Sequence, residues 1–121
     1  MPYARCTQES YSHLDHVVAH KLSEFERRGS MIRFDGSSGL EGIFRFHHEG
    51  LLDDRTVVEV HRPSGVSVEF YWSPDDAQLK RDPRGPGVSV QDALQDCNSY
   101  TLHLNMPYVR DRVARLRSER S

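Results

Sequence analysis

The sequence lacks most of the features that announce a particular chemistry or location. No run of apolar residues approaches the roughly 20 that a helix needs to cross a bilayer. Neither a glycine-rich phosphate loop nor a Gly-x-Ser-x-Gly nucleophile motif occurs. The two cysteines, Cys6 and Cys97, do not form a Cys-x-x-Cys pair. The sequence therefore predicts no cofactor and no membrane partner.

A strong charge of one sign is also missing. The chain has 16 Lys and Arg against 18 Asp and Glu, a formal net charge of -2, whereas dedicated nucleic-acid-binding proteins usually carry a strongly basic surface. Lysine is rare: only two of the 16 basic residues are Lys, a bias typical of GC-rich bacterial or phage genomes. The first residues contain no apolar segment of the signal-peptide kind, so we expect a cytoplasmic protein with free thiols at both cysteines.

What is present indicates one folded α+β domain over residues 1–121. Five Phe, five Tyr and one Trp are too many aromatic residues for a disordered chain. A helix is expected from Thr7 or Ser10 to Arg28, because apolar residues recur there at steps of three and four. Further expected elements are strands at 31–35, 41–47, 56–61, 66–72 and 100–106, a loop at 73–87, a short helix at 88–97 and a helix from Pro107 to about Ser118. This order, α-β-β-β-β-α-β-α, predicts a mostly antiparallel sheet of about five strands with helices packed on one face.

The clearest alternation lies in residues 66–72, which together with 56–61 predict a hairpin. Its apolar side chains are expected to face the core: Val66, Val68, Phe70 and Trp72. The opposite face of the sheet then carries the groups capable of acid–base chemistry: His47, Glu59, His61, Glu69, Tyr71 and His103. Imidazoles, carboxylates and a phenol on one surface are typical of acid–base or metal-assisted catalysis, although a solvated sheet face has a similar composition. If the protein is an enzyme, we expect its active site here.

The first helix carries a second candidate site, formed by His13, His16 and His20. His16 and His20 have the spacing that puts two imidazoles on one helical face, as in zinc peptidases. Val17 stands where that motif has its catalytic Glu, and the three histidines lie opposite the apolar stripe. We therefore interpret them as an exposed polar surface in preference to a metal site.

An acidic segment supports the favoured functional hypothesis. Residues 41–76 contain eight Asp and Glu against three Arg, and several of the acidic residues lie in predicted loops beside bulky residues. Such loops suit a basic partner, because complementary charge speeds association. The sequence therefore predicts a non-enzymatic protein-binding module of the inhibitor or immunity type. Its expected partner-binding residues are Glu49, Asp53, Asp54, Trp72, Asp75 and Asp76.

The C-terminal segment is basic. Residues 107–121 contain five Arg against two acidic residues, which makes nucleic-acid binding a second alternative after the enzyme. Tyr108 is the sole aromatic residue among them, whereas a nucleic-acid-binding surface usually interleaves several aromatics with its basic residues, so we rank this alternative last. Either a sheet edge or the apolar seam from Val109 to Leu116 would serve a homodimer.

Overall fold

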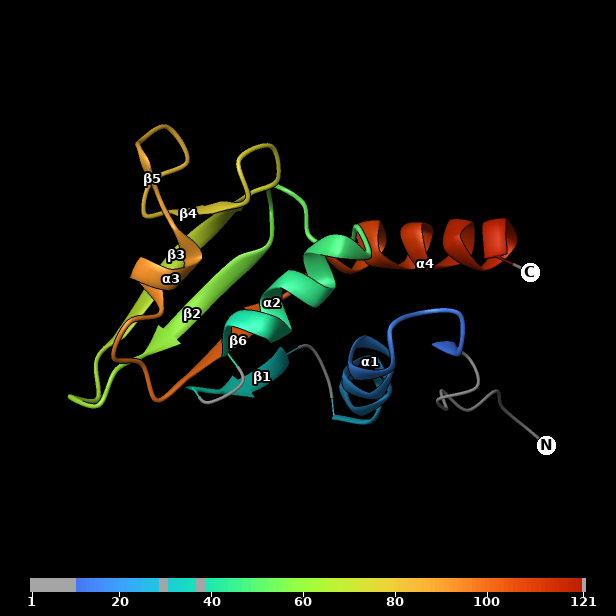
Figure 1. The fold of residues 1–121 in the computed structure, drawn as a ribbon, viewed down its shortest axis with the longest axis horizontal. Coiled ribbons are helices and arrows are strands. Elements are labelled where there is room, and N and C mark those ends of the chain that lie inside the picture. Colours follow the sequence, from blue (N-terminus) through green and yellow to red (C-terminus); the bar gives the residue numbers. More distant parts are fainter. Residues whose placement is uncertain (1–10, 29–30, 37–38, 121) are drawn as a thin grey trace.

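Six antiparallel strands and four helices make up the part of the chain that the structure describes, residues 11–28, 31–36 and 39–120 of a computed structural model (Figure 1). The elements in chain order are α1 (His16–Arg28), β1 (Met31–Asp35), α2 (Gly39–His48), β2 (Val57–His61), β3 (Ser67–Ser73), β4 (Gln78–Lys80), β5 (Gly87–Val88), α3 (Val90–Ala93), β6 (Ser99–His103) and α4 (Met106–Arg120). The strands form one sheet in the order β1-β6-β2-β3-β4-β5. The predicted α+β fold with a mostly antiparallel sheet is confirmed.

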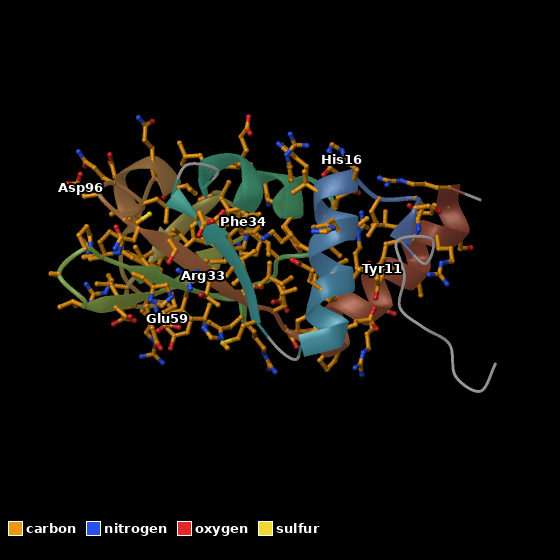
Figure 2. All side chains as sticks on the ribbon, turned by 90° about the horizontal axis from the view of Figure 1, so that it is seen from below. Tyr11, His16, Arg33, Phe34, Glu59 and Asp96 are labelled. Atoms are coloured by element: carbon orange, nitrogen blue, oxygen red, sulfur yellow. The ribbon has the colours of Figure 1, made fainter. Side chains whose placement is uncertain are left out.

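The helices divide into two groups around this sheet. Helices α2 and α3 lie against one face, while α1 and α4 lie beyond the end of the sheet at which β1 begins (Figure 1). Figure 2 shows α2 and α3 on one side of the sheet and Glu59 on the other. No helix of the described ranges covers that second side. Nor is any helix in this part of the chain long and apolar enough to cross a membrane.

The core fills the space between the sheet and α2 and continues to α1, α3 and α4, whose buried apolar side chains belong to the same cluster. Val58 is paired with Phe70 of β3 on one side and with Leu102 of β6 on the other, so the three side chains point to the same face. All three are at most 4% exposed, as are Ile43 and Phe46 of α2, which belong to the same apolar cluster. Burying each such side chain contributes about 1.5–3 kcal/mol, so this layer fixes the register of the central strands.

The expected strand at 41–47 is wrong, because this segment is helical. The alternation of Phe44 and Phe46 suggested a strand, but the fully buried residues are Ile43 and Phe46, three positions apart on one helical face. Gly42 allows α2 to approach β1 closely, since a Cβ atom at this position would overlap the ring of Phe34. The error matters for function, because it removes His47 from the sheet.

Several boundaries also differ from the expectation. Helix α1 begins at His16, because the Asp15 carboxylate caps it by accepting hydrogen bonds from the backbone N–H groups of Val17 (2.9 Å) and Val18 (3.2 Å). The start expected at Thr7 or Ser10 lies outside the described residues. The expected loop at 73–87 contains β4 and the first residue of β5, so the sheet has six strands.

The β2–β3 hairpin is confirmed, with one exception. Val68 is half-buried and both Phe70 and Trp72 are buried, as the alternation predicted. Val66 is 55% exposed because it lies in the hairpin connection, before β3 begins. The short helix expected at 88–97 is α3, and the Ser89 hydroxyl caps it by accepting a hydrogen bond from the N–H of Asp92.

Candidate functional site

The surface left uncovered by the helices holds five of the six side chains predicted to share a sheet face. We call this side of the sheet the open face and define it by Glu59, His61, Glu69, Tyr71 and His103. Glu59 is paired with Glu69 of β3 and with Thr101 of β6. All five side chains point away from the core, because along each strand they alternate with the side chains that face it. Alternation along the strands was therefore a sufficient signal for these residues.

A carboxylate–imidazole pair lies near the centre of the open face. The Nε2 atom of His103 is 3.0 Å from Oε1 of Glu59, and the two side chains are 36% and 26% exposed. The hydrogen bond with His103 is the main cause that lowers the pKa of Glu59, and the nearby imidazole of His61 lowers it further, against a smaller opposing effect of burial. Glu59 is therefore held in its charged form.

The second imidazole of the open face is fixed by two hydroxyl groups. Nδ1 of His61 is 3.0 Å from the Ser67 hydroxyl, and its Nε2 is 3.1 Å from the Thr101 hydroxyl. A neutral imidazole donates from one nitrogen and accepts at the other, and a hydroxyl can fill either role. Because both nitrogens are engaged, the ring orientation is set by three neighbouring strands.

Two carboxylates oppose each other on the open face. The backbone bonds from Trp72 N to Thr56 O and from Arg62 N to Val66 O, each 3.0 Å, fix the phase of the β2–β3 ladder. By alternation, Glu59 and Glu69 form a non-hydrogen-bonded pair, the kind whose Cα atoms lie only about 4.5 Å apart. Like charges directly opposite each other cost stability. The sheet therefore tolerates a local concentration of negative charge at this point.

His47, the sixth residue of the predicted set, lies elsewhere. It belongs to α2, on the covered side of the sheet, and its ring centroid is 5.2 Å from that of Trp72 in an edge-on arrangement. Burial lowers the pKa of His47, and the charge of the neighbouring His48 adds to this effect. The hypothesis that His47 shares an active site with Glu59 and His103 is wrong, since 41–47 is a helix.

Three of the six residues expected to bind a partner have structural roles. Trp72 is 2% exposed, and Glu49 is 8% exposed. The Glu49 carboxylate accepts a hydrogen bond from the Asp15 N–H (2.8 Å) and lies 3.1 Å from Nη2 of Arg120. The Asp53 carboxylate accepts from the side chain of Asn105 at 2.7 Å and holds the turn before β2. Trp72 and Glu49 are thus buried, and Asp53 is partly buried and bonded within the protein.

The other three acidic residues are exposed and are brought together by the hairpin. Asp54 lies in the turn before β2, and Asp75 and Asp76 lie in the turn after β3. The bond between Trp72 N and Thr56 O places these two turns at the same end of the hairpin. We call this group of three aspartates the acidic end. Tyr71, which is 38% exposed, lies on the open face next to it.

The three histidines at the start of the chain do not form a metal site. His13 lies in a turn before α1, so it does not continue the helical spacing of His16 and His20. His20 is instead 3.7 Å from the Glu24 carboxylate on its own helix. Across the described ranges, no group of three His, Cys, Asp or Glu side chains could hold a metal ion.

Arginines of α4 attach this helix to the rest of the protein. The side chain of Arg112 donates to the carbonyl of Glu49 at 3.3 Å, and Arg120 contacts both the Glu49 carboxylate and the carbonyl of His13. Arg115 pairs with Asp111 on the same helix at 3.0 Å. The sequence showed the basic segment but not these partners, which are far away along the chain. Arg112, Arg115 and Arg120 are thus engaged within the protein.

Two surface pockets of the described residues lie away from the open-face cluster of Glu59, His61 and His103. One, of about 300 Å³, is lined by Gly36, Leu40, Gln91, Asp92, Leu94 and Gln95. The other, of about 270 Å³, lies between α1 and β1. Comparison of the chain with models of protein families, with curated proteins and with solved structures gave no match. The geometry of its own residues is therefore the basis for the function proposed below.

Proposed function

We propose that the protein is a protein-binding module that docks a basic surface of another protein on its open face and acidic end. The observation that carries this proposal is the position of Tyr71. It is an exposed aromatic side chain on a sheet face that no described helix covers, with opposed carboxylates on one side and the acidic end on the other. An aromatic anchor surrounded by charged groups is typical of a protein interface.

The charges of this region favour a basic partner. The open face and the acidic end together carry five carboxylates, those of Glu59 and Glu69 and the three aspartates. Fixed positive charges also lie in this region: Lys80, which is paired in register with Tyr71, Arg55, which follows Asp54, and Arg33 on the uncovered side of β1. A negative surface of this kind steers a positively charged protein toward it and raises the association rate.

Within the binding functions, we favour neutralisation of a basic enzyme such as a nuclease or deaminase toxin. Acidic side chains on the inhibitor can occupy the basic cleft that such an enzyme uses for its anionic substrate. Binding is favoured over catalysis because the groups with acid–base chemistry lie on a sheet face, and the pockets of about 300 and 270 Å³ described above are lined by other residues. Nucleic-acid binding by α4 is disfavoured because Arg112, Arg115 and Arg120 already have partners.

The test is affinity capture with matched baits. The protein is immobilised and exposed to a lysate of the organism that makes it, in parallel with Tyr71→Ala, Glu69→Lys and the control Glu119→Lys. Both charge reversals change an exposed carboxylate by the same two charges, but Glu119 lies on α4, away from the open face. We expect one basic protein to be retained by the wild type and by the control and to be lost from the two open-face variants. Equal retention by all four baits would refute the proposed surface.

A further inference from the structure

Strand β1 lies at one end of the sheet, and β6 is the one described strand that pairs with it. The bond from Gly36 N to Asn98 O (2.8 Å) fixes the phase of this ladder. Residues 32, 34 and 36 therefore direct their backbone groups toward β6, and residues 31, 33 and 35 direct theirs outward. An outer edge of this kind is a template for pairing with another strand.

The exposed side chains of this edge include one positive and one negative charge, so the edge is complementary in charge to a second copy of itself. On the uncovered side of the sheet, Met31 is 59% exposed, and the side chains of Arg33 and Asp35 are 69% and 81% exposed. Arg33 and Asp35 are two positions apart on the same strand, with 3.9 Å between Nε and Oδ1. Ile32 and Phe34 point into the core on the other side. A positive and a negative charge thus alternate along the exposed edge.

The space beside the edge is a pocket of about 270 Å³ between β1 and α1. The Lys21 side chain of α1 extends along it, donating to the carbonyl of Arg33 at 2.8 Å and lying over the ring of Phe34. A carbonyl oxygen has two lone pairs, so the bond from Lys21 is compatible with a second bond from an added strand. Lys21 thus occupies one acceptor of the edge, and the exposed side chains of Met31, Arg33 and Asp35 lie along it.

We propose that β1 is a homodimer interface, in which a second copy of the chain pairs its own β1 antiparallel to this edge. Outward-facing residues must pair with outward-facing residues, which leaves three registers that keep most of β1 paired. One places Arg33 opposite Arg33 of the partner subunit, which is repulsive, and another places Arg33 opposite the partner's Met31, which forms no charge pair. The third places Arg33 opposite the partner's Asp35 and, by the two-fold symmetry, Asp35 opposite the partner's Arg33. Charge complementarity selects this third register.

The proposed dimer has one continuous sheet. The two-fold axis is perpendicular to the sheet, so both open faces lie on the same side of the dimer and both copies of Phe34 lie on the covered side. Each Arg33 then has two carboxylates beside it, one from its own Asp35 and one from the partner's Asp35. The Arg33–Asp35 pair, which is weak within one chain because both groups are exposed, acquires a role between chains.

The test is sedimentation velocity over a range of protein concentrations with Arg33→Asp, Asp35→Arg and the double charge swap. Each single substitution turns two attractive cross-strand pairs into repulsive ones, and we expect the dimer dissociation constant to rise roughly tenfold or more. The double swap keeps the pairs complementary, so it should dimerise like the wild type. Circular dichroism confirms that each variant is folded, which is expected because both side chains are exposed.

An equimolar mixture of the two single variants separates this register from any effect within one chain. Arg33→Asp carries two negative charges on the edge and Asp35→Arg carries two positive charges. Each variant should be monomeric alone, whereas the mixture should form a heterodimer. A wild type that stays monomeric at every concentration, single variants that dimerise like the wild type, or a mixture that stays monomeric would each overturn the proposal.

Discussion

Glu49 is the residue at which three helices meet, and its replacement by Ala is the sharpest test of the interior. It lies just after α2, its carboxylate accepts the N–H of Asp15 before α1 and contacts Arg120 of α4, and it is 8% exposed. Removing the acceptor leaves the part-buried Asp15 N–H without its partner, which costs about 1–3 kcal/mol. The ion pair with the partly exposed Arg120 contributes at most about 1 kcal/mol.

We therefore expect Glu49→Ala to lower the free energy of unfolding by about 2 kcal/mol. In urea denaturation followed by circular dichroism, this corresponds to a midpoint about 1 M lower for a slope of about 2 kcal/mol per M. Glu49→Gln keeps an oxygen for the Asp15 N–H and should lose about half as much, roughly 1 kcal/mol. Glu119→Gln, an exposed carboxylate on α4, is the matched control and should change little. If Glu49→Ala were as stable as this control, the proposed role of Glu49 would be wrong.

Three further outcomes follow from the interior and the open face. The pKa of Glu59 lies below its ordinary value of 4.5, so the stabilisation by its charged form is full above that pH and is lost as the pH falls through the pKa in the folded state. Glu59→Gln should therefore be less stable than the wild type at neutral pH. A stability difference between the two proteins that does not shrink below pH 4.5 would contradict this. Trp72 is the single Trp and lies against His47, whose pKa is lowered from 6.5 by burial. As the pH falls and His47 gains a proton, the fluorescence of Trp72 should be quenched, with the midpoint of this change below pH 6.5. The same fluorescence change in His47→Gln would rule out His47 as its origin. Gly42→Ala should destabilise the protein by about 1–3 kcal/mol despite the better helix propensity of Ala, because the added methyl group overlaps Phe34. If urea denaturation showed a more stable variant, α2 and β1 would be able to move apart at low cost.

The β2–β3 hairpin could be predicted because its pattern is local. Apolar and polar residues alternate from Ser67 to Trp72, and a slip by one residue would expose Phe70 and Trp72 together. The same alternation correctly placed Glu59, Glu69 and the other strand residues of the open face. The prediction for segment 41–47 was wrong because Phe44 and Phe46 fit the spacing of a strand, whereas Ile43 and Phe46 fit the spacing of a helix. Only packing against β1 decides between them.

The roles of the acidic residues could not be predicted, because they depend on contacts between distant parts of the chain. Glu49 and Arg120 are 71 positions apart, and Asp53 and Asn105 are 52 apart. Composition showed an acidic segment and a basic segment but not that parts of them are paired inside the protein. The acidic end, in contrast, could be predicted in part, because the β2–β3 hairpin that the sequence predicts places Asp54 beside the turn that carries Asp75 and Asp76.

The measurement that tests the proposed function most directly is carboxylate footprinting of the protein with and without its captured partner. A carbodiimide with an amine label modifies exposed carboxylates, and mass spectrometry then gives the extent of labelling at each one. We expect the partner to protect Glu69, Asp54, Asp75 and Asp76, while Glu119 on α4 stays as reactive as in the free protein. Unchanged labelling of the first four residues, with protection at other carboxylates, would show that the partner binds a different surface.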